Sequence, residues 1–426
     1  MAPPSAALDS GIDAAKVTVV SPAPPPPAKV VIRPPSPVLI ARRAAEVPVS
    51  AAHFERARAA IDRGLAWLRS SQGPNGGWLE ETQAKATDQV RASAAAPLAI
   101  TGLVLRAFSQ RDAALRVDPA VTRGIEFVRR GAWRDGRFDP DPTGSLGNYV
   151  AASIALGLVP LGTQQSGEMV RECVAWLKAN QWTQAKGVSP DQDWYGGAGY
   201  GNGRRPDLSN TQVFLDALNE AGVSATDPSV QKALVFVSRC QNLTQFNASE
   251  WCRNGRADGG MVYTPANGGE SMASAAAGEG RAGEQRPAGA PRSLRSYGSM
   301  TYAGFKSLLY AGLDQDDPRV RSALEWLLRH WTFAENPGMG QEGRYYYLHA
   351  MSRALLASGR AMIVTPDGVE HNWREELIDA IGALQSEDGS FRNSAERWME
   401  SRPELATAYL VLALEEAIKP VLQVEE

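Results

Sequence analysis

The chain has 426 residues, of which 43% are hydrophobic, and a formal net charge of -3. This length can bury a large core, and the near-balanced charge gives no general nucleic-acid-binding surface. Three cysteines, Cys173, Cys240 and Cys252, are too few for a disulfide framework, although a Cys240–Cys252 bridge stays open. No apolar run reaches the ~18 residues that span a bilayer, and the start lacks the pattern of a secretory signal. We expect a cytoplasmic protein, with peripheral membrane contact left open.

Residues 1–50 are rich in Pro, Ala and Val, and Pro24 to Pro27 are consecutive. This composition favours extended polyproline backbone and cannot bury a core. We predict a disordered Pro/Ala-rich tail over residues 1–50. A Pro-rich ligand for a partner protein is the alternative.

The pattern becomes helical after Ser50. Apolar residues recur at three- and four-residue steps, as on one face of an amphipathic helix: Phe54, Ala57, Ile61, Leu65 and Leu68. The stretch Gln72–Trp78 ends this helix, and Pro97 opens a second one. The two helices form a hairpin.

Later hairpins are marked by the way their first helices begin. An Asp-Pro pair recurs at Asp118, Asp227 and Asp317. In each pair the Asp side chain is expected to cap free backbone N–H groups at the start of a helix, and Pro presets φ for the first helical residue. Ser166 and Asn372 are the expected caps of two further first helices.

The second helices share a threonine that is followed by apolar residues at regular spacing. It stands at Thr101, Thr211, Thr301 and Thr407, and residues 149–161 and 346–359 are weaker copies. The count gives six hairpins and about twelve helices, with no period-two strand pattern. We therefore predict an all-α repeat domain over residues 51–420.

A Gly/Ala/Ser/Arg-rich interval interrupts the pattern between Thr264 and Ser296. We predict a flexible surface insertion over residues 264–296. A lid over a cavity is the functional alternative.

The loops between paired helices also repeat. The best copies are QGPNGGW at Gln72–Trp78 and QSEDGSF at Gln385–Phe391. Copies that match less well follow Gln181 and Gln241. These loops resemble the QW motifs of the terpene cyclase and protein prenyltransferase superfamily, which includes squalene–hopene cyclases and bacterial prenyltransferase and squalene oxidase repeat proteins. The resemblance implies an α/α toroid, with six helices inside and six outside around a central cavity. An open superhelix of the TPR or HEAT type is the structural alternative.

The resemblance implies a catalytic aspartate, but this sequence has no aspartate at the corresponding position. Squalene–hopene-type cyclases protonate an alkene with the central Asp of an Asp-x-Asp-Asp-Thr motif. The run Asp314–Asp317 matches four letters, but it precedes a first helix and is better explained as a helix start. The equivalent position reads Asp207-Leu208-Ser209-Asn210-Thr211, where Ser209 replaces the proton donor. A serine cannot protonate an alkene without help, which argues against ordinary cyclisation.

The zinc site of protein prenyltransferases is not matched either. Their Asp-x-Cys pair corresponds to Ser299-Met300-Thr301, which offers no good ligand, and only His349 lies near the place of their histidine. Cys252 is the one thiol expected to be exposed. We predict no metal and no cofactor.

The candidate site is instead polar and aromatic. Because the starts of the second helices converge on one mouth of a toroid, we take Asp207 and His349 as candidate catalytic residues. The candidate ligand-binding residues share that location: Ser209, Asn210, Tyr297, Tyr302, Tyr345, Tyr346 and Tyr347. Aromatic rings that face a cavity suit an apolar chain and stabilise cations. The alternative is that Tyr345 to Tyr347 only pack between hairpins.

The function we predict is binding of an isoprenoid-like apolar molecule in the central cavity. Its transformation, by a cyclase-like isomerase or a prenyltransferase-like transferase, is left open. A non-catalytic scaffold that binds a protein or peptide is the alternative. A third interpretation is a glycosidase-like toroid, which needs two carboxylates across the cavity, and Glu396, Glu400 and Glu404 are the available acids.

Overall fold

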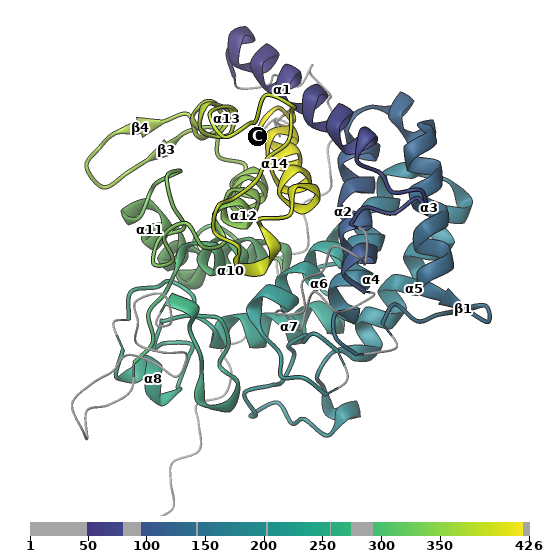
Figure 1. Cartoon of the computed structure of the whole chain (residues 1–426). Helices are drawn as coiled ribbons and strands as arrows, with labels where there is room; N and C mark the ends of the chain where they lie inside the picture. Colours follow the sequence, from purple (N-terminus) through teal and green to yellow (C-terminus); the bar gives the residue numbers. More distant parts are fainter. Residues whose placement is uncertain are drawn as a thin grey trace, which may run out of the picture. The chain divides into compact units, whose positions relative to one another are not determined.

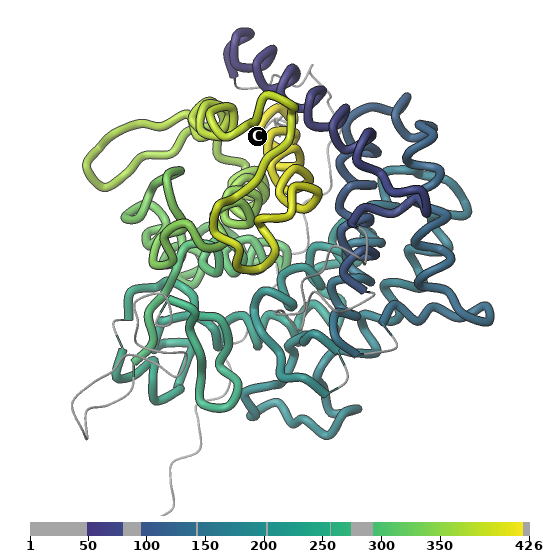
Figure 2. Tube along the Cα trace, viewed as in Figure 1, coloured from purple at the N-terminus to yellow at the C-terminus, as the bar shows by residue number. Residues whose placement is uncertain are grey.

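Paired helices make up most of the chain. The computed structural model describes residues 49–79, 95–141, 144–201, 203–255, 257–273 and 293–420, and in these ranges the chain forms six hairpins, each with an outer and an inner helix (Figures 1 and 2). The predicted tail lies outside the described residues up to residue 48, as does the middle of the predicted insertion, residues 274–292. The two ends of that insertion are packed into the protein, where Thr264, Met272 and Leu294 are buried.

The inner helices close a ring. The outer helices are α1 (Ala51–Ser70), α3 (Pro119–Ala132), α5 (Gln164–Asn180), α7 (Pro228–Arg239), α11 (Pro318–Arg329) and α13 (Trp373–Gly382). The inner helices are α2 (Ala95–Arg111), α4 (Gly147–Leu158), α6 (Leu208–Glu220), α10 (Gly298–Tyr310), α12 (Arg344–Ala357) and α14 (Pro403–Ala417). Each inner helix packs against the next, and α14 packs against α2. The predicted α/α toroid is therefore confirmed, and an open superhelix is excluded.

Several short elements lie in the loops that connect the helices of the ring. The short helix α8 (Glu250–Arg253) follows α7. One antiparallel ribbon pairs β1 (Trp133–Arg134) with β2 (Arg137–Phe138), and another pairs β3 (Ile363–Val364) with β4 (Glu370–His371). None of the described helices is both long and apolar enough to cross a bilayer.

The distribution of apolar residues decides which helix of a pair lies inside. In α3 the buried residues fall on one face: Ala120, Val121, Gly124, Val128 and Ala132. In α14 every residue from Leu405 to Ala417 is buried except Tyr409. A helix that is apolar on all sides is stable only when other helices cover all sides. The second helix of each pair therefore lies inside the ring.

The predicted caps of the first helices agree with the structure at all but one position, whereas α2 already includes Ala95 and is not opened by Pro97. Asp118, Asp227 and Asp317 each accept a hydrogen bond from the backbone N–H of the second helical residue, with Pro at the first. Asn372 caps α13. The expectation for Ser166 is wrong, because Thr163 caps α5 and Ser166 is the third helical residue, which completes a capping box.

A glutamine side-chain amide, buried or half-buried, joins neighbouring hairpins at four of the six junctions. The Nε2 group of Gln181 donates to the carbonyl of Gly196 in its own loop and to that of Ser229 in α7, both at 2.8 Å. Gln72, Gln241 and Gln385 make the same pair of bonds to their own loop and to the outer helix of the next hairpin, at 2.8–3.0 Å. The bond from Gln385 reaches Ala60 in α1 and so closes the ring.

The repeated threonine ties the same loops to the inner helices. The Oγ1 atoms of Thr101, Thr211, Thr301 and Thr407 accept backbone N–H groups at 3.0–3.1 Å, from Trp78, Ala198, Met261 and Phe391 respectively. Glutamine and threonine together therefore fix each of these loops between an outer and an inner helix. The two sequence repeats have one structural cause.

The glycine of each such loop should be harder to replace than an ordinary turn glycine. Gly196 has φ +83°, and an added Cβ would lie 1.8 Å from the carbonyl oxygen of Lys232. Gly187 has φ +76°, with no atom within 4 Å of an added Cβ. Backbone strain alone should make Gly187→Ala cost about 1–2 kcal/mol, whereas strain plus the clash should make Gly196→Ala cost roughly 3–5 kcal/mol. Urea unfolding of both variants tests this, and equal losses would contradict it.

Candidate functional site

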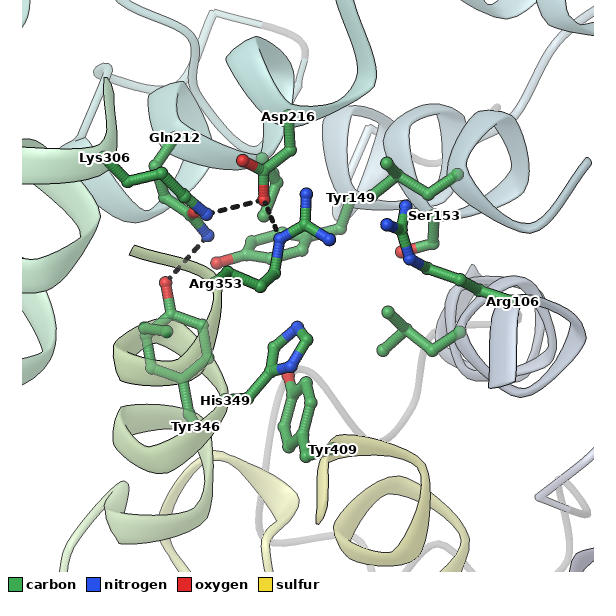
Figure 3. Close-up of a pocket in the computed structure, with 14 residues that line it drawn as sticks. Arg106, Tyr149, Ser153, Gln212, Asp216, Lys306, Tyr346, His349, Arg353 and Tyr409 are labelled. Atoms are coloured by element: carbon green, nitrogen blue, oxygen red, sulfur yellow. Dashed lines mark hydrogen bonds and ion pairs between the residues drawn. The ribbon is translucent and has the colours of Figure 1, made fainter. Parts of the chain in front are cut away.

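A small cavity lies on the axis of the ring, and all six inner helices contribute to its wall (Figure 3). Its volume is about 40 Å³. The residues that line it are Leu103, Arg106, Tyr149, Ser153, Leu156, Gln212, Val213, Asp216, Lys306, Tyr346, His349, Ala350, Arg353 and Tyr409. Aromatic side chains come from the N-terminal halves of their helices, and charged side chains come from the middle or C-terminal halves.

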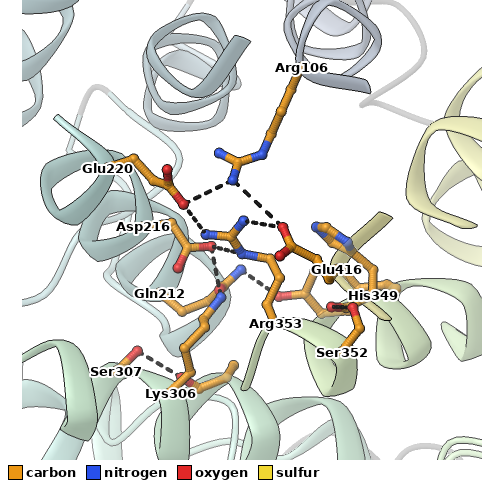
Figure 4. Close-up of polar contacts among 12 residues, drawn as sticks. Arg106, Gln212, Asp216, Glu220, Lys306, Ser307, His349, Ser352, Arg353 and Glu416 are labelled. Atoms are coloured by element: carbon orange, nitrogen blue, oxygen red, sulfur yellow. Dashed lines mark hydrogen bonds and ion pairs between the residues drawn. The ribbon is translucent and has the colours of Figure 1, made fainter. Parts of the chain in front are cut away.

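Six buried or half-buried charges lie toward the C-terminal ends of the inner helices (Figure 4). Glu220 of α6 accepts hydrogen bonds from Arg106 of α2 at 2.9 Å and from Arg353 of α12 at 3.1 Å. Arg353 also donates to Glu416 of α14 at 3.3 Å.

Lys306 of α10 and Asp216 of α6 form another ion pair in this layer, at 2.7 Å. Lys306 also donates to Gln212 at 2.6 Å, and the Nε atom of Arg353 lies 3.5 Å from Asp216. Five of the six inner helices therefore supply a charge. The cluster of Arg106, Asp216, Glu220, Lys306, Arg353 and Glu416 closes this end of the cavity.

Burial and neighbouring charges set the protonation states around the cluster. Burial lowers the pKa of Lys306 to about 8, and Asp216 opposes this shift by stabilising the ammonium form. Burial raises the pKa of Glu416, but Lys419 and the arginines of the cluster outweigh that effect and hold the pKa below its usual value. Burial, reinforced by Arg353 and Lys306, holds the pKa of His349 well below its usual value, so the imidazole is neutral at pH 7.

Aromatic side chains form the opposite part of the cavity wall. The rings of His349 and Tyr409 stack with centroids 5.5 Å apart, and Tyr346 meets Tyr409 edge-on at 5.9 Å. The hydroxyl of Tyr346 accepts a hydrogen bond from Gln212 at 3.0 Å. Tyr149 contacts Ser209 through their hydroxyl groups. The cavity thus combines aromatic faces with a charged floor.

The structure brings together only part of the predicted site. His349 and Tyr346 line the cavity, and Ser209 bonds to the cavity residue Tyr149. Asp207 instead caps α6, accepting from the backbone N–H of Asn210 at 2.8 Å and from its side chain. Burial raises the pKa of Asp207 to about 6.

The other predicted tyrosines lie outside the cavity wall. Tyr345 donates its hydroxyl to the carbonyl of Arg392, and Tyr347 donates to that of Thr332. Tyr302 packs edge-on against Tyr347 with centroids 5.5 Å apart, and Tyr297 is buried. For Tyr345 and Tyr347, packing between hairpins describes the structure better than ligand contact.

The sequence interpretation missed the ionic cluster, although a signal for it exists. Arg106, Asp216 and Lys306 each stand five positions after the repeated threonine, at Thr101, Thr211 and Thr301. A charge at one register of otherwise apolar helices places charges from different hairpins in one layer of the ring. The pairing among them was not accessible without the closed ring.

Three remaining predictions are also decided by the structure. Asp317 caps α11, which confirms the run Asp314–Asp317 as a helix start. Cys252 is buried, so its predicted exposure is wrong, and burial raises its thiol pKa to about 11. All three cysteines are free. Among the described residues, no three His, Cys, Asp or Glu side chains are grouped so that they could hold a metal ion.

Known structures share the fold of this chain. A D-mannose isomerase is 13% identical with a TM-score of 0.50, covering 88% of this chain and 99% of the other. A family 76 glycoside hydrolase from a bovine Bacteroides thetaiotaomicron strain is 9% identical with a TM-score of 0.52, covering 86% and 78%. The type II terpene cyclase MstE from Scytonema is 12% identical with a TM-score of 0.31, covering 85% and 99%. The sequence matches no family model and no curated protein. The likenesses to the isomerase and the glycoside hydrolase show the fold alone, an α/α toroid.

Replacing either of two adjacent glutamates of α14 with glutamine should change the stability of the protein in opposite directions. Burial raises the pKa of Glu415 to about 8, whereas Glu416 stays ionised beside Arg353. Glu415→Gln should stabilise the protein by about 1–3 kcal/mol at pH 7, because the unfolded wild type gains free energy by ionising. Glu416→Gln should cost about 3–5 kcal/mol, because it leaves buried cations unpaired.

Urea unfolding at several pH values provides the measurement. A raised folded-state pKa makes the stabilising contribution of protonated Glu415 complete below pH ~4.5 and lost as the pH rises through about 8. The advantage of Glu415→Gln over the wild type should therefore grow across that window. Similar losses in both variants would contradict the assignment.

Proposed function

We propose that the central cavity binds a small polar molecule with several hydrogen-bonding groups. The observation that carries this proposal is a set of three buried polar atoms of the cavity wall: Arg106 Nη1, Asp216 Oδ1 and His349 Nδ1 have no hydrogen-bond partner among the described residues. A buried donor or acceptor without a partner costs about 1–3 kcal/mol. A ligand that bonds to these atoms removes that cost and so binds favourably.

The size of the cavity supports a small ligand. A volume of about 40 Å³ accommodates roughly three water molecules when each needs on the order of 10–15 Å³. A compact polyol or hydroxy acid is closer to that size than a polyprenyl chain. An apolar chain would also remove water from Arg106 and Asp216 without offering them hydrogen bonds.

The charges of the wall favour binding over glycoside hydrolysis. A glycosidase needs two carboxyl groups on opposite sides of the scissile bond. Asp216 is the one carboxylate in the cavity wall of the described chain, and it is paired with Lys306. Glu400, an acid available for this role from the sequence, accepts backbone N–H groups of Tyr345 and Tyr346 instead. The neutral His349 and the tyrosine hydroxyls suit recognition of ligand hydroxyl groups.

An isoprenoid-like ligand is the second candidate. The aromatic rings of Tyr149, Tyr346 and Tyr409 favour it, since such rings suit apolar chains and carbocations. This candidate needs a cavity larger than the one described. Extraction of the purified protein with organic solvent, followed by mass spectrometry, tests it, and a stoichiometric polyprenyl or triterpene lipid would favour it over the polar ligand. A protein or peptide partner stays a prediction.

A calorimetric and thermal-shift screen tests the polar ligand. Small polyols, sugars and hydroxy acids form the panel, and the expected hit stabilises the wild type by about 2.7 kcal/mol at 100 times its Kd. Ala350→Val adds methyl groups to the cavity wall without changing any charge, so it should abolish the stabilisation by that ligand. Ala59→Val, on the exposed face of α1, is the matched control and should keep it. A hit that survives Ala350→Val unchanged would place the ligand elsewhere.

A further inference from the structure

A segment between α13 and α14, residues 393–402, lies across the N-terminal end of α12, and we call it the strap (Figure 2). Its residue Glu400 is fully buried and accepts hydrogen bonds from the backbone N–H groups of Tyr345 at 3.2 Å and Tyr346 at 2.7 Å. Tyr346 lines the cavity. The strap is therefore bonded directly to the backbone that carries a cavity residue.

One side chain of the strap holds it to two other segments. Arg397 donates to the carboxylate of Glu342, just before α12, at 2.6 Å. Its second terminal nitrogen lies 3.6 Å from the sulfur of Met272, in the segment that leads toward α10. Arg397 thus spans the N-terminal end of α12 and reaches the neighbouring hairpin. We call the two contacts of Arg397 the latch, and one substitution at Arg397 removes both.

The backbone of the strap is strained next to the latch. Trp398 has φ +55° and Met399 has φ +66°, the left-handed region that side chains other than glycine rarely adopt. Met399 is buried, whereas Trp398 remains 41% exposed. Consecutive residues in this conformation persist only where surrounding contacts hold them, and such strain is typical of switching segments. The surrounding contacts include those of Arg397 and Glu400, and a hydrogen bond from the side chain of Asn393 to the carbonyl of Gln341 at 2.8 Å.

The opposite end of the cavity offers no comparable opening. The ionic cluster joins five inner helices there, and separating them would break several buried ion pairs at once. A molecule that reaches the cavity therefore enters from the N-terminal ends of the inner helices. Among the described loops at that end, the strap is one where two consecutive residues other than glycine have positive φ and whose backbone contacts lead directly to a cavity residue.

We propose that the strap is a gate, and that release of the Arg397 latch lets small molecules enter the central cavity. The gate regulates the site described above, so its biological purpose rests on the proposed binding function. Its existence does not, because access to the cavity can be measured without any ligand. Release frees two strained backbone positions and exposes the N–H groups that Glu400 accepts.

Chemical labelling of His349 in the full-length protein measures that access. Diethyl pyrocarbonate modifies neutral imidazole, and His349 lies in the cavity wall. The other histidines, His53, His330 and His371, provide internal references in the same mass spectrum. Arg397→Ala should raise the labelling rate of His349 about tenfold relative to these references. Arg56→Ala removes an exposed ion pair with Asp379 on the outer surface and should leave the rate unchanged.

Hydrogen exchange of the Tyr345 and Tyr346 amides gives a second reading. Arg397→Ala and Glu400→Gln should both speed this exchange, while amides in the middle of α14 keep their protection. An unchanged His349 rate in an Arg397→Ala protein with a normal unfolding transition would overturn the gate. A raised rate without any ligand from the panel would support the gate and reject the proposed binding function.

Discussion

The ring depends on a bond that four of its six hairpins make to the next hairpin through one glutamine amide. A glutamine Nε2 group has two hydrogens, and here one satisfies the glutamine's own loop while the other reaches the next outer helix. Asparagine is one methylene shorter, and the carboxylate of glutamate has no hydrogen to donate to either carbonyl. The glycine that follows lets the loop approach the next helix closely. These junctions, with the threonine contacts of the same loops, fix four of the six inner helices and so help to place the cavity.

The buried charges at the centre are the least expected part of a helical ring. Removing six charged groups from water is unfavourable, and an apolar layer of similar volume would fill the same space at lower cost. Their presence is therefore better explained by specificity or binding than by stability. The pairing of Arg353 with acids from two different helices also fixes which helices face each other.

Local signals explain why the fold was predictable and the site was not. Asp118 and its two copies cap helices through atoms two residues away, so the sequence contains the whole interaction. The contacts of Lys306 depend on a helix 90 residues distant and become visible only when the ring is closed. Cys252 was misjudged for the same reason, since its position in a loop did not reveal the packing of Trp251 and Leu294 around it.

The junction between the last hairpin and the first is built like three of the others. Gln385 bonds to Ala60 as Gln181 bonds to Ser229, although no peptide bond links α14 to α1. The contacts between the last hairpin and the first are therefore of the same kind as those between hairpins that the backbone connects. A circularly permuted chain, opened at another outer loop and joined between α14 and α1, would meet the same set of neighbours. The linear order of the hairpins is thus one of several that this architecture accepts.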